Sequence, residues 1–100
     1  MTFKEDIINK IKADFGDNSA SAFAILENAI SKTDDLSSDR VIRCIIFLAE
    51  GNMDDLNKYI KAATTDTRDI MLWAEYETST EKRLRDFDNT FEESSIDINE

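Results

Sequence analysis

The chain has 100 residues, with 22 acidic and 12 basic side chains, a net charge of −10, no histidine and no proline. Nucleic acid and anionic lipid repel such a chain, because binding to either relies on Lys and Arg to neutralise phosphate. We therefore expect no direct nucleic-acid contact and no membrane association.

The length corresponds to one domain, and its composition favours helices. Two glycines and no proline leave few of the turn residues that a sheet protein needs. The sequence predicts an all-α fold, a single small irregular bundle of about five helices. Residues 1–78 form the expected helical domain, residues 79–91 a short helix or a strap docked on it, and residues 92–100 a polar, disordered acidic tail.

The first two helices are expected at residues 2–15 and about 19–32. Thr2 and Glu5 form a capping-box pattern at the first start, and Gly16 is placed to end that helix. Apolar residues recur at helical spacing in both segments: Phe3, Ile7, Ile8, Ile11 and Phe15, then Ala22, Phe23, Leu26, Ala29 and Ile30.

The central helix is expected at residues 38–50, with Ser37 as its N-cap. The run 41–49 is almost entirely apolar and leaves only a narrow water-facing line, formed by Asp39, Arg43 and Glu50. A helix that is apolar nearly all round must be enclosed by its neighbours. We expect the rest of the chain to pack around it.

Two more helices follow, the first capped by Asn52 and the second by Asp66. The last is again nearly all apolar between residues 70 and 74. Aromatic residues on such stripes usually belong to the core with their polar tips at the surface. We expect this of Tyr59, Trp73 and Tyr76.

The sequence shows no combination of residues that is typical of a catalytic, phosphate-binding or calcium-binding site. Without histidine there is no Ser-His or Cys-His relay, and Cys44 lies in the most apolar run, where a thiol packs as a small hydrophobe. There is no glycine-rich phosphate loop, and the acidic spacing over residues 86–97 lacks the glycine of a calcium loop. We expect no cofactor and no metal. The charged N-terminal residues do not resemble a signal peptide, so the expected location is cytoplasmic.

Two glutamates each end an apolar helix, Glu50 and Glu75. They could face one another as a metal site or an acid–base pair. We instead favour a structural role, in which they lie at helix ends in water or form ion pairs with Arg43 and Arg68, and we expect Arg68-Asp69 to tie loops together.

The segment around residues 83–91 alternates bases, acids and aromatics. Its candidate interaction residues are Arg83, Arg85, Phe87 and Phe91. If this segment is undocked, the two phenylalanines are exposed anchors for a partner; if it is docked, they cover the core of this same domain.

A resemblance adds to this interpretation. The chain carries Phe47-Leu48-Ala49, Gly51-Asn52, Leu56 with Tyr59, Arg68-Asp69, Trp73-Ala74-Glu75-Tyr76 and Arg83-x-Arg85-Asp86-Phe87. Over residues 40–87 it resembles short, uncharacterised bacterial all-helical proteins. The resemblance implies a compact helical unit and attaches no activity or catalytic residue to it.

The leading hypothesis is a non-enzymatic protein–protein interaction module with an unknown protein partner, and the net charge of the chain would suit a basic one. A second is an acidic inhibitor, either an immunity protein or a nucleic-acid mimic that blocks a basic partner; it requires acids clustered on one face. A third is a carboxylate-based enzyme or metal protein, which requires Glu50 and Glu75 close to a common point.

Overall fold

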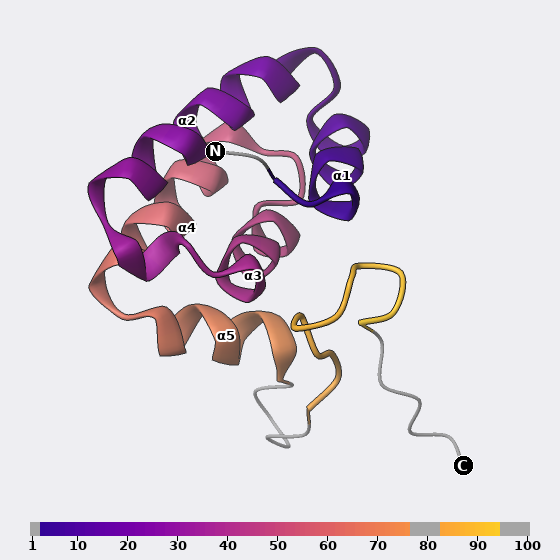
Figure 1. Cartoon of the computed structure of the whole chain (residues 1–100), viewed down its shortest axis with the longest axis vertical. Helices are drawn as coiled ribbons and strands as arrows, with labels where there is room; N and C mark the ends of the chain where they lie inside the picture. The colour runs from indigo at the N-terminus through magenta and orange to yellow at the C-terminus, as the bar shows by residue number, and fades with distance from the viewer. Residues whose placement is uncertain (1–2, 77–82, 95–100) are drawn as a thin grey trace.

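The computed structural model describes residues 3–76 and 83–94, which fold as a small helical bundle with an extended C-terminal segment (Figure 1). The all-α prediction is confirmed. The described part contains no strand, and Tyr76 and Arg83 form an isolated antiparallel bridge. None of its helices is long and apolar enough to cross a membrane. The helices are α1 (Glu5–Phe15), η1 (Gly16–Asn18), α2 (Ser19–Lys32), η2 (Asp34–Leu36), α3 (Asp39–Ala49), α4 (Met53–Thr65) and α5 (Thr67–Glu75).

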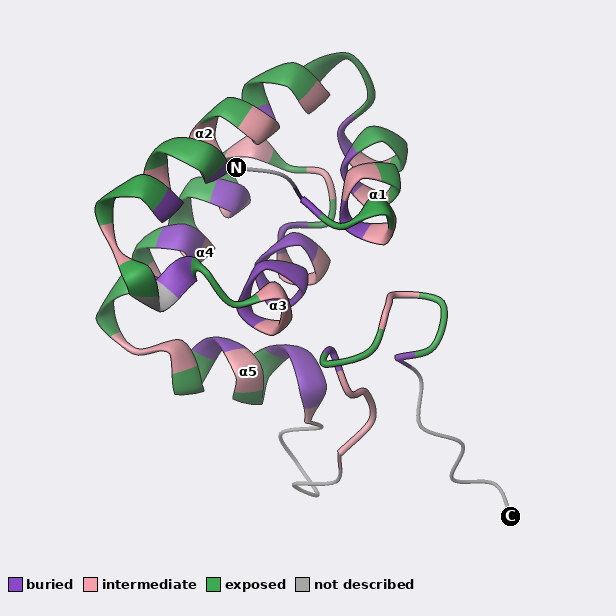
Figure 2. Ribbon diagram, in the orientation of Figure 1, coloured by how far each residue is buried: buried purple, intermediate pink, exposed green. Residues whose placement is uncertain are grey.

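Helix α3 is the centre of the bundle, as predicted. It packs against α4 and α5 and also touches α1, and Figure 2 shows it buried on most of its surface. The predicted water-facing line is wrong at one position, because Arg43 is only 5% exposed. A buried guanidinium requires partners of opposite charge, and these are described below. The apolar side chains that α3 buries are Val41, Ile42, Cys44, Ile45, Ile46 and Ala49.

The sequence predicts four helix N-caps, and the structure has the predicted residue at two of them and a different residue at the other two. The Asn52 side chain accepts a hydrogen bond from the Asp55 N–H, and Asp66 accepts one from the Arg68 N–H, so both predicted caps are confirmed. The N-cap of α3 is Ser38, not Ser37, and its side chain makes no cap hydrogen bond. Helix α1 begins at Glu5 with Lys4 as its N-cap. Thr2, the expected cap, lies outside the described residues.

The turn between α3 and α4 brings the chain against α1. Glu50 ends α3 in the left-handed conformation with φ 49°, and Gly51 follows with φ 79°. A Cβ built on Gly51 would overlap the carbonyl oxygen of Asp14 in α1. Glycine is therefore required here both for its backbone conformation and for the close approach of two backbones.

Residues 83–94, called the strap from here on, lie docked on the bundle without forming a helix. Phe87 is 1% exposed, and its ring lies 5.3 Å from that of Phe47 and 5.5 Å from that of Phe91. Ser94 is also buried, so the expected disorder from residue 92 needs correcting for residues 92–94. Residues 77–82 and 95–100, which cover the start of the predicted 79–91 segment and most of the predicted tail, lie outside the described residues.

Candidate functional site

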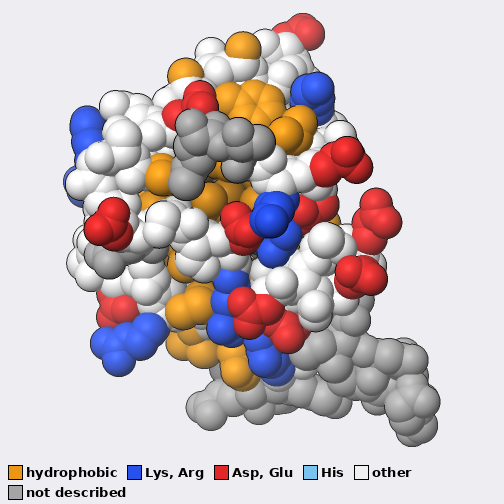
Figure 3. Space-filling model, in the orientation of Figure 1, with side chains coloured by type: hydrophobic (Ala, Val, Ile, Leu, Met, Phe, Trp, Pro, Cys, Tyr) orange, Lys and Arg blue, Asp and Glu red, His pale blue; other side chains and the backbone are white. Residues whose placement is uncertain are grey.

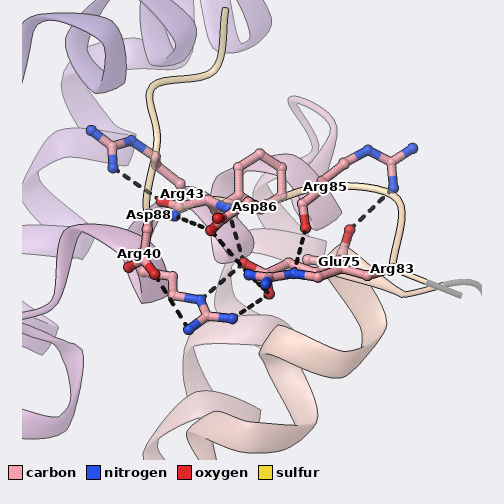
Figure 4. Close-up of polar contacts among 9 residues, drawn as sticks. Arg40, Arg43, Glu75, Arg83, Arg85, Asp86 and Asp88 are labelled. Carbon is pink, nitrogen blue, oxygen red and sulfur yellow. Dashed lines mark hydrogen bonds and ion pairs between the residues drawn. The ribbon is translucent and has the colours of Figure 1, made fainter. Parts of the chain in front are cut away.

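Charged side chains converge where α3 and α5 meet the strap (Figure 4), and Asp6 of α1 pairs with one of them, Arg43. We call Asp6, Arg40, Arg43 and Glu75 the clasp. The two arginines are three residues apart on α3 and so project from neighbouring positions on one side of it. Arg40 pairs with Glu75 of α5, and Arg43 pairs with Asp6 of α1. The central helix therefore holds both flanking helices through charge-assisted bonds.

Glu75 is completely buried, and each of its carboxylate oxygens accepts two hydrogen bonds. Arg40 binds it in bidentate fashion, with Nε 2.9 Å from one oxygen and Nη2 2.5 Å from the other. Arg83 Nη2 lies 3.3 Å from the second oxygen, and the Phe87 N–H donates to the first at 2.9 Å. A carboxylate offers about four lone-pair positions. All of them are used within the chain, which leaves none for a substrate or a metal.

Asp6 forms the second half of the clasp in the same way. Arg43 binds its two oxygens at 2.8 and 3.0 Å, and the Phe91 N–H donates to it at 3.1 Å. Arg43 also donates to the Phe87 carbonyl at 3.0 Å. Burial alone would raise the pKa of Asp6, but the bonds from Arg43 and the Phe91 N–H outweigh it and hold the pKa below its ordinary value of 3.8. Each clasp carboxylate thus fixes one backbone N–H of the strap.

The four candidate interaction residues of the strap all make contacts within this chain. Arg83 donates to Asp86 at 3.0 Å and to the Arg85 carbonyl at 3.1 Å. The Arg85 guanidinium lies over the Phe47 ring, 4.3 Å from its centroid. Phe87 is buried and Phe91 is half-buried, so they cover the core of this domain and are not exposed anchors.

Arg43 and Arg68 each form an ion pair, but not with the predicted glutamates, and Glu75 pairs instead with Arg40 and Arg83. Arg43 pairs with Asp6, as described above, and not with Glu50, which is exposed. Arg68 is 85% exposed at its side chain and pairs with its own helix cap, Asp66. Within the described residues, the hydrogen bonds of Arg68 go to Asp66 and not to Glu75, and Asp69 is exposed. These surface contacts contribute little to folding.

Glu50 and Glu75 do not form a common site. Glu75 binds Arg40 near the start of α3, whereas Glu50 is the residue at which α3 ends. At 1.5 Å per residue, these positions are about 15 Å apart along the helix axis. Among the described residues, no group of three Cys, Asp or Glu side chains could hold a metal ion.

Cys44 is also shielded from solvent. It is 0% exposed in the core of α3. Burial raises its pKa well above the ordinary value, since a thiolate would lose its hydration there. The thiol is therefore protonated and inert at neutral pH.

The outer face of α5 departs from the expected core packing. Leu72 is 47% exposed and Trp73 is 44% exposed, and these are the exposed large hydrophobic side chains of the described residues. The Trp73 ring packs edge-on against Tyr59 of α4, with centroids 6.3 Å apart. We call Leu72 and Trp73 the α5 patch. Sequence reasoning placed Trp73 in the core because residues 70–74 are all apolar.

Comparison of the chain with models of protein families, with curated proteins and with solved structures found no match.

Proposed function

We propose that this protein is a cytoplasmic, non-enzymatic protein–protein interaction module that binds a basic protein partner through the α5 patch. The observation that carries the proposal is the exposure of nearly half of both Leu72 and Trp73. Adjacent exposed apolar side chains of this size mark interaction surfaces, and tryptophan is among the residues that most often dominate binding energy.

The surroundings of the patch support a binding role. Tyr59 contacts one edge of Trp73, which restricts the indole ring before any partner arrives. A side chain that is already ordered loses less entropy on binding. In Figure 3, apolar side chains reach the surface over α5, at the lower end of the molecule.

Charge supports a basic partner. Beside the α5 patch, Asp69 lies one turn before Leu72 and Trp73 on the same helix face. The helix cap Asp66 is paired with Arg68, so the net charge is the main support for a basic partner. The whole chain carries a net charge of −10. Attraction between opposite charges speeds encounter and discriminates against acidic competitors.

The two alternatives receive less support from the described residues. An enzyme built on Glu50 and Glu75 would need them at one point, and they lie near opposite ends of α3. An acidic inhibitor would need its acids on one face. The exposed acids are contributed by separate elements and not by one helix; they include Glu5, Glu27, Asp54, Asp69 and Glu92, on α1, α2, α4, α5 and the strap.

The test is affinity capture with the full chain followed by titration of the captured protein. The variant is Trp73→Ala, and the matched control is Glu27→Gln, an exposed change on α2. Loss of a tryptophan hot spot weakens binding by roughly 30-fold or more, and the control leaves it unchanged. The partner should be basic, and association should slow as salt is added.

The proposal fails if the captured protein binds Trp73→Ala as tightly as it binds the unaltered chain. It also fails if the partner is acidic. Circular dichroism of the variant shows that any loss does not come from unfolding, because Trp73 lies half outside the core.

A further inference from the structure

A second surface feature lies away from both the clasp and the α5 patch. It is a groove of about 470 Å³ between α2 and α4. Ile25 and Ala29 of α2 and Ile60 of α4 form its apolar floor, and all three are partly or fully buried. The volume lies within the range of small-molecule pockets in proteins, which are apolar with a few polar groups at fixed places.

The polar groups at this groove are basic or neutral. Lys32 at the end of α2 and Lys61 on α4 both line it, and both are exposed. None of the nine described residues that line it is acidic, although 22 of the chain's 100 residues are. The charged residues that line the groove are therefore basic, in a molecule whose net charge is negative.

The two lysines are available to a ligand. Within the described residues, the lysine in an ion pair is Lys10, which binds Asp14, and neither Lys32 nor Lys61 has such a partner. The Asn28 side chain lies beside them on α2 and is exposed. Two unpaired ammonium groups and an amide next to an apolar floor suit an anionic group that carries an apolar body.

We propose that the α2–α4 groove binds a small amphipathic monocarboxylate, with its alkyl body on Ile25, Ala29 and Ile60 and its carboxylate between Lys32 and Lys61. The apolar floor supplies the area that the ligand removes from water. The two lysines select its charge. The groove does not include any residue of the α5 patch, so this inference does not depend on the proposed interaction with a protein.

The experiment is a titration of the isotope-labelled full chain with octanoate, followed by two-dimensional amide NMR. Three matched compounds separate the contributions: acetate lacks the alkyl body, octanamide lacks the charge, and octylammonium reverses it. Octanoate should shift the amide resonances of Ile25, Ala29 and Ile60 in a saturable way. Each of the other three should bind at least about fivefold more weakly, since exposed ion pairs are individually modest.

Variants then test the lysines directly. Lys32→Gln combined with Lys61→Gln should weaken octanoate binding by about tenfold. Lys58→Gln is the matched control, because Lys58 is an exposed lysine of the same helix α4 that does not line the groove and instead lies over the Tyr59 ring. The control should leave the affinity unchanged.

Three results would overturn the inference. The first is no saturable shift at the groove, or shifts confined to the α5 patch. The second is equal affinity for octanoate and octanamide, which would show that the lysines do not contribute to binding. The third is a shift of the same resonances with protein concentration alone, which would make the groove a contact between copies of this chain.

Discussion

Replacing Glu75 by Gln is the sharpest perturbation of the clasp, because it keeps the shape of the side chain and removes its charge. Four donors converge on the carboxylate, from Arg40, Arg83 and the Phe87 N–H. An amide offers one acceptor oxygen and turns its NH₂ group toward donors. At least one arginine then loses its partner while Glu75 itself is fully buried.

The magnitude follows from burial. Removing one partner of a buried ion pair destabilises a protein by about 3–5 kcal/mol. The Arg40 and Arg83 side chains are 28% and 33% exposed, so water can hydrate a guanidinium that loses its partner, and this offsets part of the lost stability. We expect the free energy of unfolding of Glu75→Gln to fall by about 2–4 kcal/mol. In a domain of this size, the melting temperature should drop by roughly 10–25 °C.

Urea unfolding followed by circular dichroism measures the change, and a double-mutant cycle isolates the pair. Arg40→Met in the Glu75→Gln background should cost about 1–3 kcal/mol less than in the unaltered chain. Arg68→Met is the control, because its ion pair with Asp66 is exposed, and it should leave the stability nearly unchanged. A change of under about 0.5 kcal/mol for Glu75→Gln would refute the structural role of the clasp.

Three other predictions follow from single sites. Gly51→Ala should destabilise by about 2–4 kcal/mol in urea unfolding, because it adds backbone strain at positive φ to an overlap with the Asp14 carbonyl. Gly16→Ala should cost less, because its φ of 52° is strained but an added Cβ meets open space; equal effects would contradict the close approach. The pKa of Asp6 is lower in the folded state than in the unfolded chain, so its stabilisation is complete above pH 3.8 and is lost as pH falls through the folded value. The stability gap between the unaltered chain and Asp6→Asn, measured by urea unfolding at a series of pH values, should therefore shrink on acidification, and a constant gap would argue against the Arg43 contact. Cys44 should react with a thiol reagent only at the rate of unfolding, since its thiol is buried with a raised pKa; rapid labelling of the native protein would show that the core is open.

The helices were predictable because their signals are local. Apolar spacing and the cap residues Asn52 and Asp66 act within a few residues of one another, so they can be seen in one sequence. The central place of α3 followed from the same logic, since a run of apolar residues from 41 to 49 has no stable alternative to enclosure.

The partners of the arginines were not predictable in this way. The Arg43–Asp6 pair spans 37 residues and the Arg40–Glu75 pair spans 35. Nothing local distinguishes Asp6 or Glu75 from the many other acids of the chain. The signal that was available is the spacing of Arg40 and Arg43 on an otherwise apolar helix, since buried guanidinium groups require carboxylates nearby.

The exposure of the α5 patch was not predictable either, although its residues lie next to one another in the sequence. An apolar run predicts a buried helix only if enough neighbours exist to cover it. Helices α3 and α4 bury Ile70 and Ala74 of α5, whereas Leu72 and Trp73 stay nearly half exposed, with one edge of Trp73 against Tyr59 of α4. The number of covering elements is a property of the whole fold and cannot be derived from the run itself.

Site-specific photo-cross-linking tests the proposed function most directly. Two variants of this chain are made, one with a photoreactive phenylalanine analogue at position 72 and one with the same analogue at position 27 on α2. Interaction through the α5 patch predicts a cross-link to one basic protein from position 72 and none from position 27. A cross-link to that protein from position 27 alone would contradict it.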